Sequence, residues 1–281
     1  MKKSRWLNIA KWSTAIALSS AFMATNVQAH SLWMLPSEFN LSTEGETWIT
    51  VDATASNSVF SVDKPIALDQ VTIYSADGKR HRMGSYFKGK RRSVFDFEIN
   101  QEGTYKVELR PQPRYMTLFE MGDKNQRKRV FGNKQEAKVP SGAKNVRTVA
   151  MQSIAGFYVT QKAPSDKVLE TTGKGFELHA LTHPSDIVEQ EESRFKFTYN
   201  GKPVANTQVE ITPHGTAWRS AREEMELKTD KDGIVVFTPE KTGPHLLIIS
   251  MRNDIDKNDA SSVLADSMGV NYHLTFEVLP Q

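Results

Sequence analysis

Residues 94–109 read Val-Phe-Asp-Phe-Glu-Ile-Asn-Gln-Glu-Gly-Thr-Tyr-Lys-Val-Glu-Leu, and this stretch decides the fold class. Apolar and polar side chains alternate over 94–99 and again over 105–109, which is the period of a strand with one buried face. Glu102-Gly103 separates the two runs, and a glycine in such a place is typical of a tight turn. We therefore predict a β-hairpin whose two strands pair with each other.

The same two signals recur along the rest of the chain. Short alternating or apolar runs are separated by turn sequences such as Asp77-Gly78 and Asn200-Gly201. They indicate an all-β protein, and the regular spacing in the second half favours a sandwich of the immunoglobulin or prealbumin kind. The further strands that we expect cover 47–51, 71–74, 148–159, 176–181, 195–199, 208–211, 234–237, 245–250 and 272–279.

Turn-forming residues at 163–166 and 171–175 indicate a junction between two β-sandwich domains. We divide the chain into a signal peptide (1–29), an N-terminal β domain (30–162) and a C-terminal β-sandwich domain (163–281). Residues 30–160 hold 19 Lys and Arg against 14 Asp and Glu, a charge of +5, whereas residues 161–281 hold 13 against 19, a charge of −6. Opposite charges predict that the basic half docks on the acidic half.

The composition excludes several classes of site. The chain has no cysteine, so disulfides, thiolate metal sites and cysteine nucleophiles are all impossible. The net charge of +3 includes four basic residues of the expected signal peptide, which leaves −1 for the mature chain and no reason to expect nucleic acid as a partner. Neither a Gly-x-Ser-x-Gly motif nor a phosphate-binding loop occurs.

The first residues have the pattern of an export signal. Lys2, Lys3 and Arg5 precede an apolar run at 15–24, and Val27-Gln28-Ala29 fits the small-x-small motif before a signal-peptidase cut. The run is too short to span a bilayer. Cleavage after Ala29 predicts a periplasmic protein without a membrane span, whose first residue is His30; cleavage after Ala21 is the weaker alternative.

An N-terminal histidine is a ready chelator. Its α-amine has an ordinary pKa of about 8, so it gives up a proton easily, and the amine and ring Nδ1 can then hold one ion. Two nitrogens suit nickel, cobalt, copper or zinc. The alternative is that the cleavage leaves a histidine at this position by chance and that the terminus frays in solvent. The apolar residues Leu32, Trp33 and Leu35 favour the metal, because they would pack the terminus down.

The remaining ligands are less evident among the seven histidines. No pair has the His-Glu-x-x-His spacing of a zincin. His183 precedes Pro184 at the end of an expected strand and is the best second ligand, whereas His245 and His273 lie within strands and are expected to be structural. Asp52 and Asp186 follow strand ends and are candidate oxygen ligands.

Five segments of the chain carry a family pattern: 29–36, 51–57, 92–96, 177–186 and 276–281. Together they resemble an exported bacterial family of unknown function that is often labelled a nickel/cobalt-transport periplasmic component. The resemblance implies His30 and the Thr-His-Pro histidine, His183, as functional residues. The family usually lacks a histidine at the positions of His179, His214 and His273, and it often has Asp-His where this chain has Asp63-Lys64.

We expect a non-enzymatic periplasmic protein that binds nickel, cobalt or copper for uptake or delivery, with an inner- or outer-membrane transporter as a candidate partner. One alternative is a copper enzyme of the histidine-brace type, although no flat aromatic substrate surface or axial tyrosine can be assigned. The other is a structural or interaction β-sandwich that holds no metal.

Overall fold

The structure is a computed structural model that describes residues 31–281. These residues form three β-sheets, here called sheets A, B and C, and no helix among them is long and apolar enough to cross a membrane. The predicted signal peptide, its cleavage site and His30 lie outside the described residues. The short 3₁₀ helices are η1 (Lys167–Leu169), η2 (Thr216–Trp218) and η3 (Ala260–Val263).

Sheet A runs in the order β1-β3-β8-β7, with β4 beside β3; its strands are β1 (Ser31–Pro36), β3 (Thr47–Ser56), β4 (Lys64–Pro65), β7 (Met83–Lys88) and β8 (Ser93–Ile99). Sheet C contains β13 (Phe176–Ala180), β14 (Ser193–Tyr199), β15 (Lys202–Pro203) and β18 (Ile234–Phe237). Sheet B follows the path β17-β16-β19-β20-β12-β9-β5-β6, and β2, β10 and β11 lie off this path. Its strands are β2 (Asn40–Leu41), β5 (Val71–Tyr74), β6 (Arg80–His81), β9 (Gly103–Leu109), β10 (Arg114–Met121), β11 (Gln126–Phe131), β12 (Lys144–Gln161), β16 (Gln208–Pro213), β17 (Met225–Lys228), β19 (Gly243–Asp254) and β20 (Ser267–Val278).

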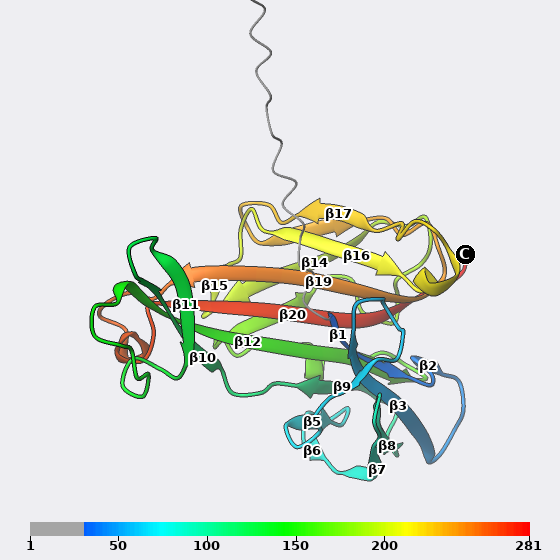
Figure 1. The fold of residues 1–281 in the computed structure, drawn as a ribbon. Coiled ribbons are helices and arrows are strands. Elements are labelled where there is room, and N and C mark those ends of the chain that lie inside the picture. The colour runs from blue at the N-terminus through cyan, green and yellow to red at the C-terminus, as the bar shows by residue number, and fades with distance from the viewer. Residues whose placement is uncertain (1–30) are drawn as a thin grey trace, which may run out of the picture.

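The long strand β12 supplies one face to each of two hydrophobic cores. Ile154 and Tyr158 belong to the core of the second half, whereas Ala155, Phe157 and Val159 belong to the core of the first half. Successive side chains on a strand point to opposite faces, so one strand can serve both cores. Figure 1 shows β12 in the middle of the molecule, beside β20, with β9 at its far end.

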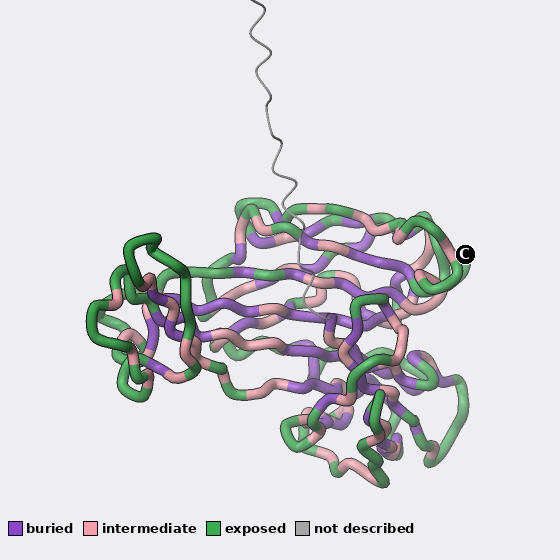
Figure 2. The backbone as a smooth tube through the Cα atoms, viewed as in Figure 1, coloured by how far each residue is buried: buried purple, intermediate pink, exposed green. Residues whose placement is uncertain are grey.

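The all-β prediction is confirmed, and the second half is the sandwich that the spacing indicates. Sheet C packs on one face of sheet B through a cluster of aromatic side chains. Phe176 stacks on Tyr272 with ring centroids 5.3 Å apart, and Phe195 meets the edge of Phe276 at 6.0 Å. Figure 2 shows that buried residues follow the long strands and that the connecting loops are exposed.

The two halves of the chain have separate cores but share one sheet. Strands β5 and β9 of the first half and β16, β19 and β20 of the second all belong to sheet B. Ion pairs also join them: Lys134 Nζ lies 2.7 Å from Asp266 Oδ1, and Arg147 pairs with Asp254. The domain boundary between residues 162 and 163 stays a prediction, because sheet B continues across β12 without interruption.

The hairpin predicted for residues 94–109 is wrong. Strand β8 pairs with β3 and β7 in sheet A, whereas β9 pairs with β5 and β12 in sheet B. The two strands therefore form an arch, with their apolar faces opposed across the first core; the rings of Phe97 and Tyr105 lie 6.4 Å apart there. The alternation identified the buried residues correctly, but it carries no information about which strand is the hydrogen-bond partner.

Tyr105 holds the arch in place. Its side chain is fully buried, and its hydroxyl oxygen accepts hydrogen bonds from the backbone N–H groups of Asn100 and Gln101 at 3.1 and 3.0 Å. The hydroxyl donates in turn to Asn100 Oδ1 at 3.2 Å. This is the arrangement of the tyrosine corner in immunoglobulin-like sandwiches, where a tyrosine hydroxyl bonds back to the preceding turn.

We expect Gly103→Ala to cost about 2 kcal/mol or more of the free energy of unfolding. Gly103 has φ +122°, where other residues are strained, and an added Cβ would lie 2.7 Å from both Ala76 Cβ and Ser165 Oγ. Gly122→Ala is the matched control, since Gly122 has φ +72° but open space around it, and it should cost about 1 kcal/mol. Equal urea midpoints for the two variants would contradict the steric argument.

Candidate functional site

Strand β1 anchors the start of the described chain, as its apolar residues predict. Trp33 is 1% exposed, and its indole Nε1 donates to Ser56 Oγ at 3.3 Å. The ring meets Phe60 edge-on at 5.4 Å and belongs to a small core cluster with Leu246 of β19. The expected anchor is confirmed, and Ser31 is thereby held opposite Ser56 at the end of sheet A.

Asp52 lies away from the start of β1. It pairs in register with Leu35, four residues along β1 from Ser31, which corresponds to about 13 Å at 3.3 Å per residue. Its carboxylate forms an ion pair with Arg92 Nη1 at 3.0 Å. The structure therefore places Asp52 on the middle of sheet A, and its role as a metal ligand stays a prediction.

Both ring nitrogens of His183 take part in hydrogen bonds. Nε2 lies 3.1 Å from Thr104 Oγ1, and Nδ1 lies 2.6 Å from Ser185 Oγ and accepts from the Ser185 N–H at 3.1 Å. Thr104 also contacts Thr160 Oγ1 at 3.0 Å and accepts from the Ser165 N–H at 3.0 Å. His183 thus joins the loop after β13 to the strands β9 and β12, and a metal would have to displace these bonds.

Asp186 is exposed and follows His183 on the same loop. Its backbone N–H donates to the His183 carbonyl at 2.9 Å, and it borders a surface hollow of about 460 Å³ that Asn40 and Thr160 also line. No three His, Asp or Glu side chains gather in a metal-ligating group anywhere in residues 31–281. The candidate ligands of the described chain are therefore not brought together, and His30 lies outside it.

The expectation that His245 and His273 are structural agrees with their surroundings. His245 is 1% exposed, stacks on Phe276 at 5.6 Å and has its Nδ1 2.9 Å from the Gly243 carbonyl. His273 is 5% exposed, with Nδ1 3.2 Å from the Ile154 carbonyl. Burial lowers the pKa of each ring to about 4, so both are neutral at pH 7.

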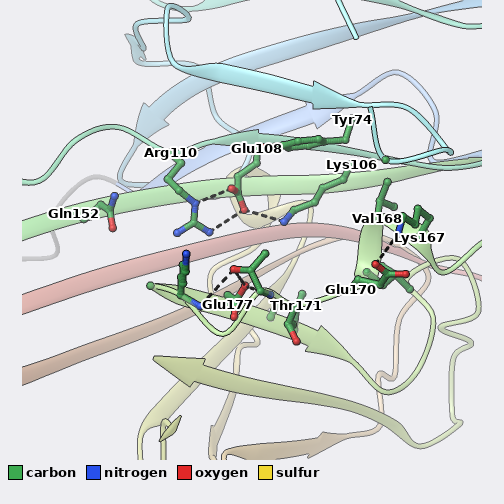
Figure 3. A pocket seen from close by; sticks show the side chains of 16 residues that line it. Tyr74, Lys106, Glu108, Arg110, Gln152, Lys167, Val168, Glu170, Thr171 and Glu177 are labelled. Carbon is green, nitrogen blue, oxygen red and sulfur yellow. Dashed lines mark hydrogen bonds and ion pairs between the residues drawn. The ribbon is translucent and has the colours of Figure 1, made fainter. Parts of the chain in front are cut away.

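A charged cleft lies between the two halves and was not foreseen. Lys106 and Glu108 of β9 and Arg110, directly after it, point to one side, while Tyr105, Val107 and Leu109 point to the other and fill the first core. The segment 167–178 stands opposite and encloses a cleft of about 610 Å³. Figure 3 shows the three charged side chains above this segment, with Gln152 of β12 at one end and Tyr74 of β5 beside Lys106.

Glu108 is the buried centre of the cleft floor. Arg110 donates to its two carboxylate oxygens at 2.7 and 3.1 Å, and Lys106 Nζ lies 3.1 Å from Oε2. Burial alone would raise the pKa of Glu108, but the two cations outweigh it and hold the pKa below its usual value. Arg110 also donates to the Phe176 carbonyl at 3.0 Å and so joins β9 to sheet C.

The opposite wall is organised by Glu177. Its carboxylate accepts from the Thr172 N–H at 2.6 Å, the Thr172 hydroxyl at 2.8 Å and the Gly173 N–H at 2.8 Å. These bonds fix the loop 171–175, where Gly173 and Gly175 both have positive φ. The sequence predicted this loop as a junction between domains. The alternating charges of β9, however, are what a solvent-exposed strand face also shows. The sequence therefore contains no pattern that distinguishes the cleft from an exposed surface.

Comparisons with known proteins give a family and a weak likeness of fold. The model of a domain of unknown function, DUF4198, matches residues 27–253. No curated protein is significantly similar to the chain. The D0-D1 domain of intimin is 13% identical, with a TM-score of 0.22 over 88% of this chain and 98% of that one. The adhesin InvE of Yersinia pseudotuberculosis is 12% identical, with a TM-score of 0.19 over 88% and 58%. TM-scores this low do not support any inference about the function of this chain.

Proposed function

Because the chain belongs to the DUF4198 family, whose description leaves its activity open, we propose a function from the residues themselves. The protein is a non-enzymatic binding protein of the periplasm that holds one divalent transition metal ion, nickel, cobalt or copper, for uptake or delivery. His30, as the first residue of the mature chain, binds the ion through its amine and its ring. A membrane transporter is the partner that would receive it.

The observation that supports this proposal is the anchoring of β1. A terminal amine and imidazole bind an ion well only when the chain behind them is fixed, because ordering a free end costs conformational entropy. Ser31 is 6% exposed and Trp33 is 1% exposed, so the chain is packed down from Ser31 onward. A frayed terminus would offer the same two nitrogens without this advantage.

The two acids predicted from sequence stay the candidate oxygen ligands of this proposal. Asp52 is opposite Leu35, four residues along β1 from Ser31, and pairs with Arg92. Asp186 is adjacent to His183, whose ring nitrogens are both engaged. His183 remains a candidate ligand only if it leaves these hydrogen bonds, each worth about 1 kcal/mol.

Extending the mature terminus by one residue should weaken metal binding at least about 100-fold, because the free amine becomes an amide and the chelate is lost. Titration calorimetry with nickel, cobalt and copper would compare the native and extended proteins. His183→Ala should weaken binding further, and His179→Ala, at an exposed position, is its control. Affinity should also fall as the pH drops below about 6.5, where the ring binds a proton.

Equal affinity of the native and extended proteins would overturn the proposal. Absence of any stoichiometric metal would favour the metal-free interaction module instead. Consumption of a reductant with formation of peroxide by the copper-loaded protein would favour the histidine-brace enzyme. The intact mass of the exported protein establishes whether the mature chain begins at His30, and the metal-binding proposal depends on this.

A further inference from the structure

We propose that the cleft between β9 and the segment 167–178 is a binding site for a small carboxylate-bearing molecule with an apolar part. It is separate from the proposed metal site, since the cleft residues belong to sheet B and the junction segment, whereas β1 begins at the end of sheet A. Its volume of about 610 Å³ lies within the range of small-molecule sites.

On the floor of the cleft the two cationic side chains are more exposed than the carboxylate of Glu108. The side chains of Lys106 and Arg110 keep 25% and 31% of their exposure, whereas Glu108 keeps 8%. Both oxygens of Glu108 are already used by the two cations. Two positive charges against one negative charge leave a surplus of +1, and this surplus faces the open side of the cleft.

Arg110 still has a donor to offer. Its Nε and Nη2 donate to Glu108 and Phe176, while Nη1 has no hydrogen bond within the described residues. A guanidinium held by a carboxylate on one edge can bind a second oxyanion on another, because its five N–H groups lie in one rigid plane. Lys106 uses one contact and also keeps donors, so the floor can bind a carboxylate from two sides.

The rim carries two cationic and two anionic side chains and therefore leaves the surplus of the floor unchanged. Glu177 is occupied by the loop N–H groups of Thr172 and Gly173, and Glu170 pairs with Lys167 at 2.8 Å. Lys174 is exposed at the edge and has no ion pair within residues 31–281. The lining then holds four cationic and three anionic side chains, a net charge of +1, which favours an anion over a cation.

Apolar side chains complete the lining and define the rest of the ligand. Val168, Leu169 and Leu178 are at most 9% exposed, and Tyr74 closes the wall on the side of β5. Gly78 also lines the cleft, close to Lys167: an added Cβ at Gly78 would lie 3.1 Å from Lys167 Cγ. A hydrocarbon group of modest size fits such a wall and gains from burial, at roughly 25 cal/mol per Å².

Calorimetric titration of the metal-free mature protein with hexanoate and benzoate would test the proposal. We expect saturable one-to-one binding of both, and none of hexylamine or benzylamine, which have the same shape and the opposite charge. Inorganic phosphate should bind at least tenfold more weakly because it has no apolar part. Extension of the N-terminus should leave carboxylate affinity unchanged, so this result does not depend on the metal proposal.

Two variants locate the site. Lys174→Gln changes only an exposed rim residue and should lower benzoate affinity about three- to tenfold. Arg110→Lys keeps the charge beside Glu108 but removes the planar fork, and should lower it at least tenfold. Lys124→Gln, on the exposed turn between β10 and β11, is the control and should have no effect. No saturable binding up to millimolar concentration, equal binding of the amines, or full affinity in both variants would each overturn the proposal.

Discussion

Lowering the pH from 7 to 4 is expected to remove roughly 3 kcal/mol of stability through each of two buried histidines, His245 and His273. Burial lowers the pKa of both to about 4 in the folded protein, against 6.5 for an ordinary histidine. Between pH 6.5 and pH 4 the unfolded chain therefore binds protons on these histidines that the folded chain does not bind. The stabilisation is complete above pH 6.5 and is lost as the pH falls from 6.5 towards 4.

The positive charges around His245 act in the same direction. After burial, the nearby His214, Arg219 and Lys241 further lower its pKa, while its contact with the Gly243 carbonyl opposes them. His273 depends on burial alone, offset by its contact with the Ile154 carbonyl. Protonation of either ring would leave a charge without a counterion in a core of aromatic and aliphatic side chains, which is strongly unfavourable.

Urea unfolding at pH 7 and pH 4 measures this effect as a difference between variants. Carboxylates with lowered pKa values, such as Glu108 and Asp266, also reduce the stability of the protein when they are protonated in acid. The acid sensitivity of the parent protein alone therefore does not isolate the contribution of the histidines. The variant His245→Gln/His273→Gln should lose about 6 kcal/mol less than the parent between the two pH values. His179→Gln, at an exposed position, is the control, and a double variant as acid-sensitive as the parent would contradict the prediction.

Glu108→Gln is expected to cost about 3–5 kcal/mol of the free energy of unfolding. The substitution keeps the shape of the side chain but removes the charge that Lys106 and Arg110 share. Both cations are largely buried against β12 and the junction segment, so they would be left without compensation. The loss should appear in urea or thermal unfolding at pH 7, where Glu108 is ionised because its pKa is lowered.

Glu44→Gln is the matched control for this variant. Glu44 also forms an ion pair, with Lys162 Nζ at 2.5 Å, but its side chain is 85% exposed. Exposed pairs contribute about 0–1 kcal/mol, so this change should be small. Adding Lys106→Met to Glu108→Gln should recover part of the loss by removing one uncompensated cation. Equal effects of the two glutamate changes would mean that the cleft floor behaves as solvated surface.

The two proposed ligands bind to different parts of the molecule. The metal proposal depends on His30 and the end of sheet A, and the carboxylate proposal depends on β9 and residues 167–178. Neither the family description nor the distant adhesin structures distinguishes between them. The N-terminal extension does, since it should abolish one activity and leave the other unchanged.

Local alternation along the chain is enough to identify the apolar side chains of β8 and β9 that fill a core. Phe95, Phe97 and Ile99 in β8, and Tyr105 and Val107 in β9, alternate with polar residues, and all five are completely buried. The apolar anchor after His30 and the structural roles of His245 and His273 were likewise predictable, because each follows from local pattern. Period-2 alternation is a property of a few consecutive residues, so it survives in any tertiary arrangement.

The pairing of strands and the contacts between charged residues depend on the fold as a whole. Strands β8 and β9 are close in sequence but lie in different sheets, and β12 pairs in parallel with β20, more than a hundred residues later. The packing of sheet C on sheet B brings residues 167–178 over the charged face of β9 and turns Lys106, Glu108 and Arg110 from an apparent solvent face into the floor of a cleft. Backbone hydrogen bonds are alike at every residue, so the partner of a strand is selected by packing across the whole molecule.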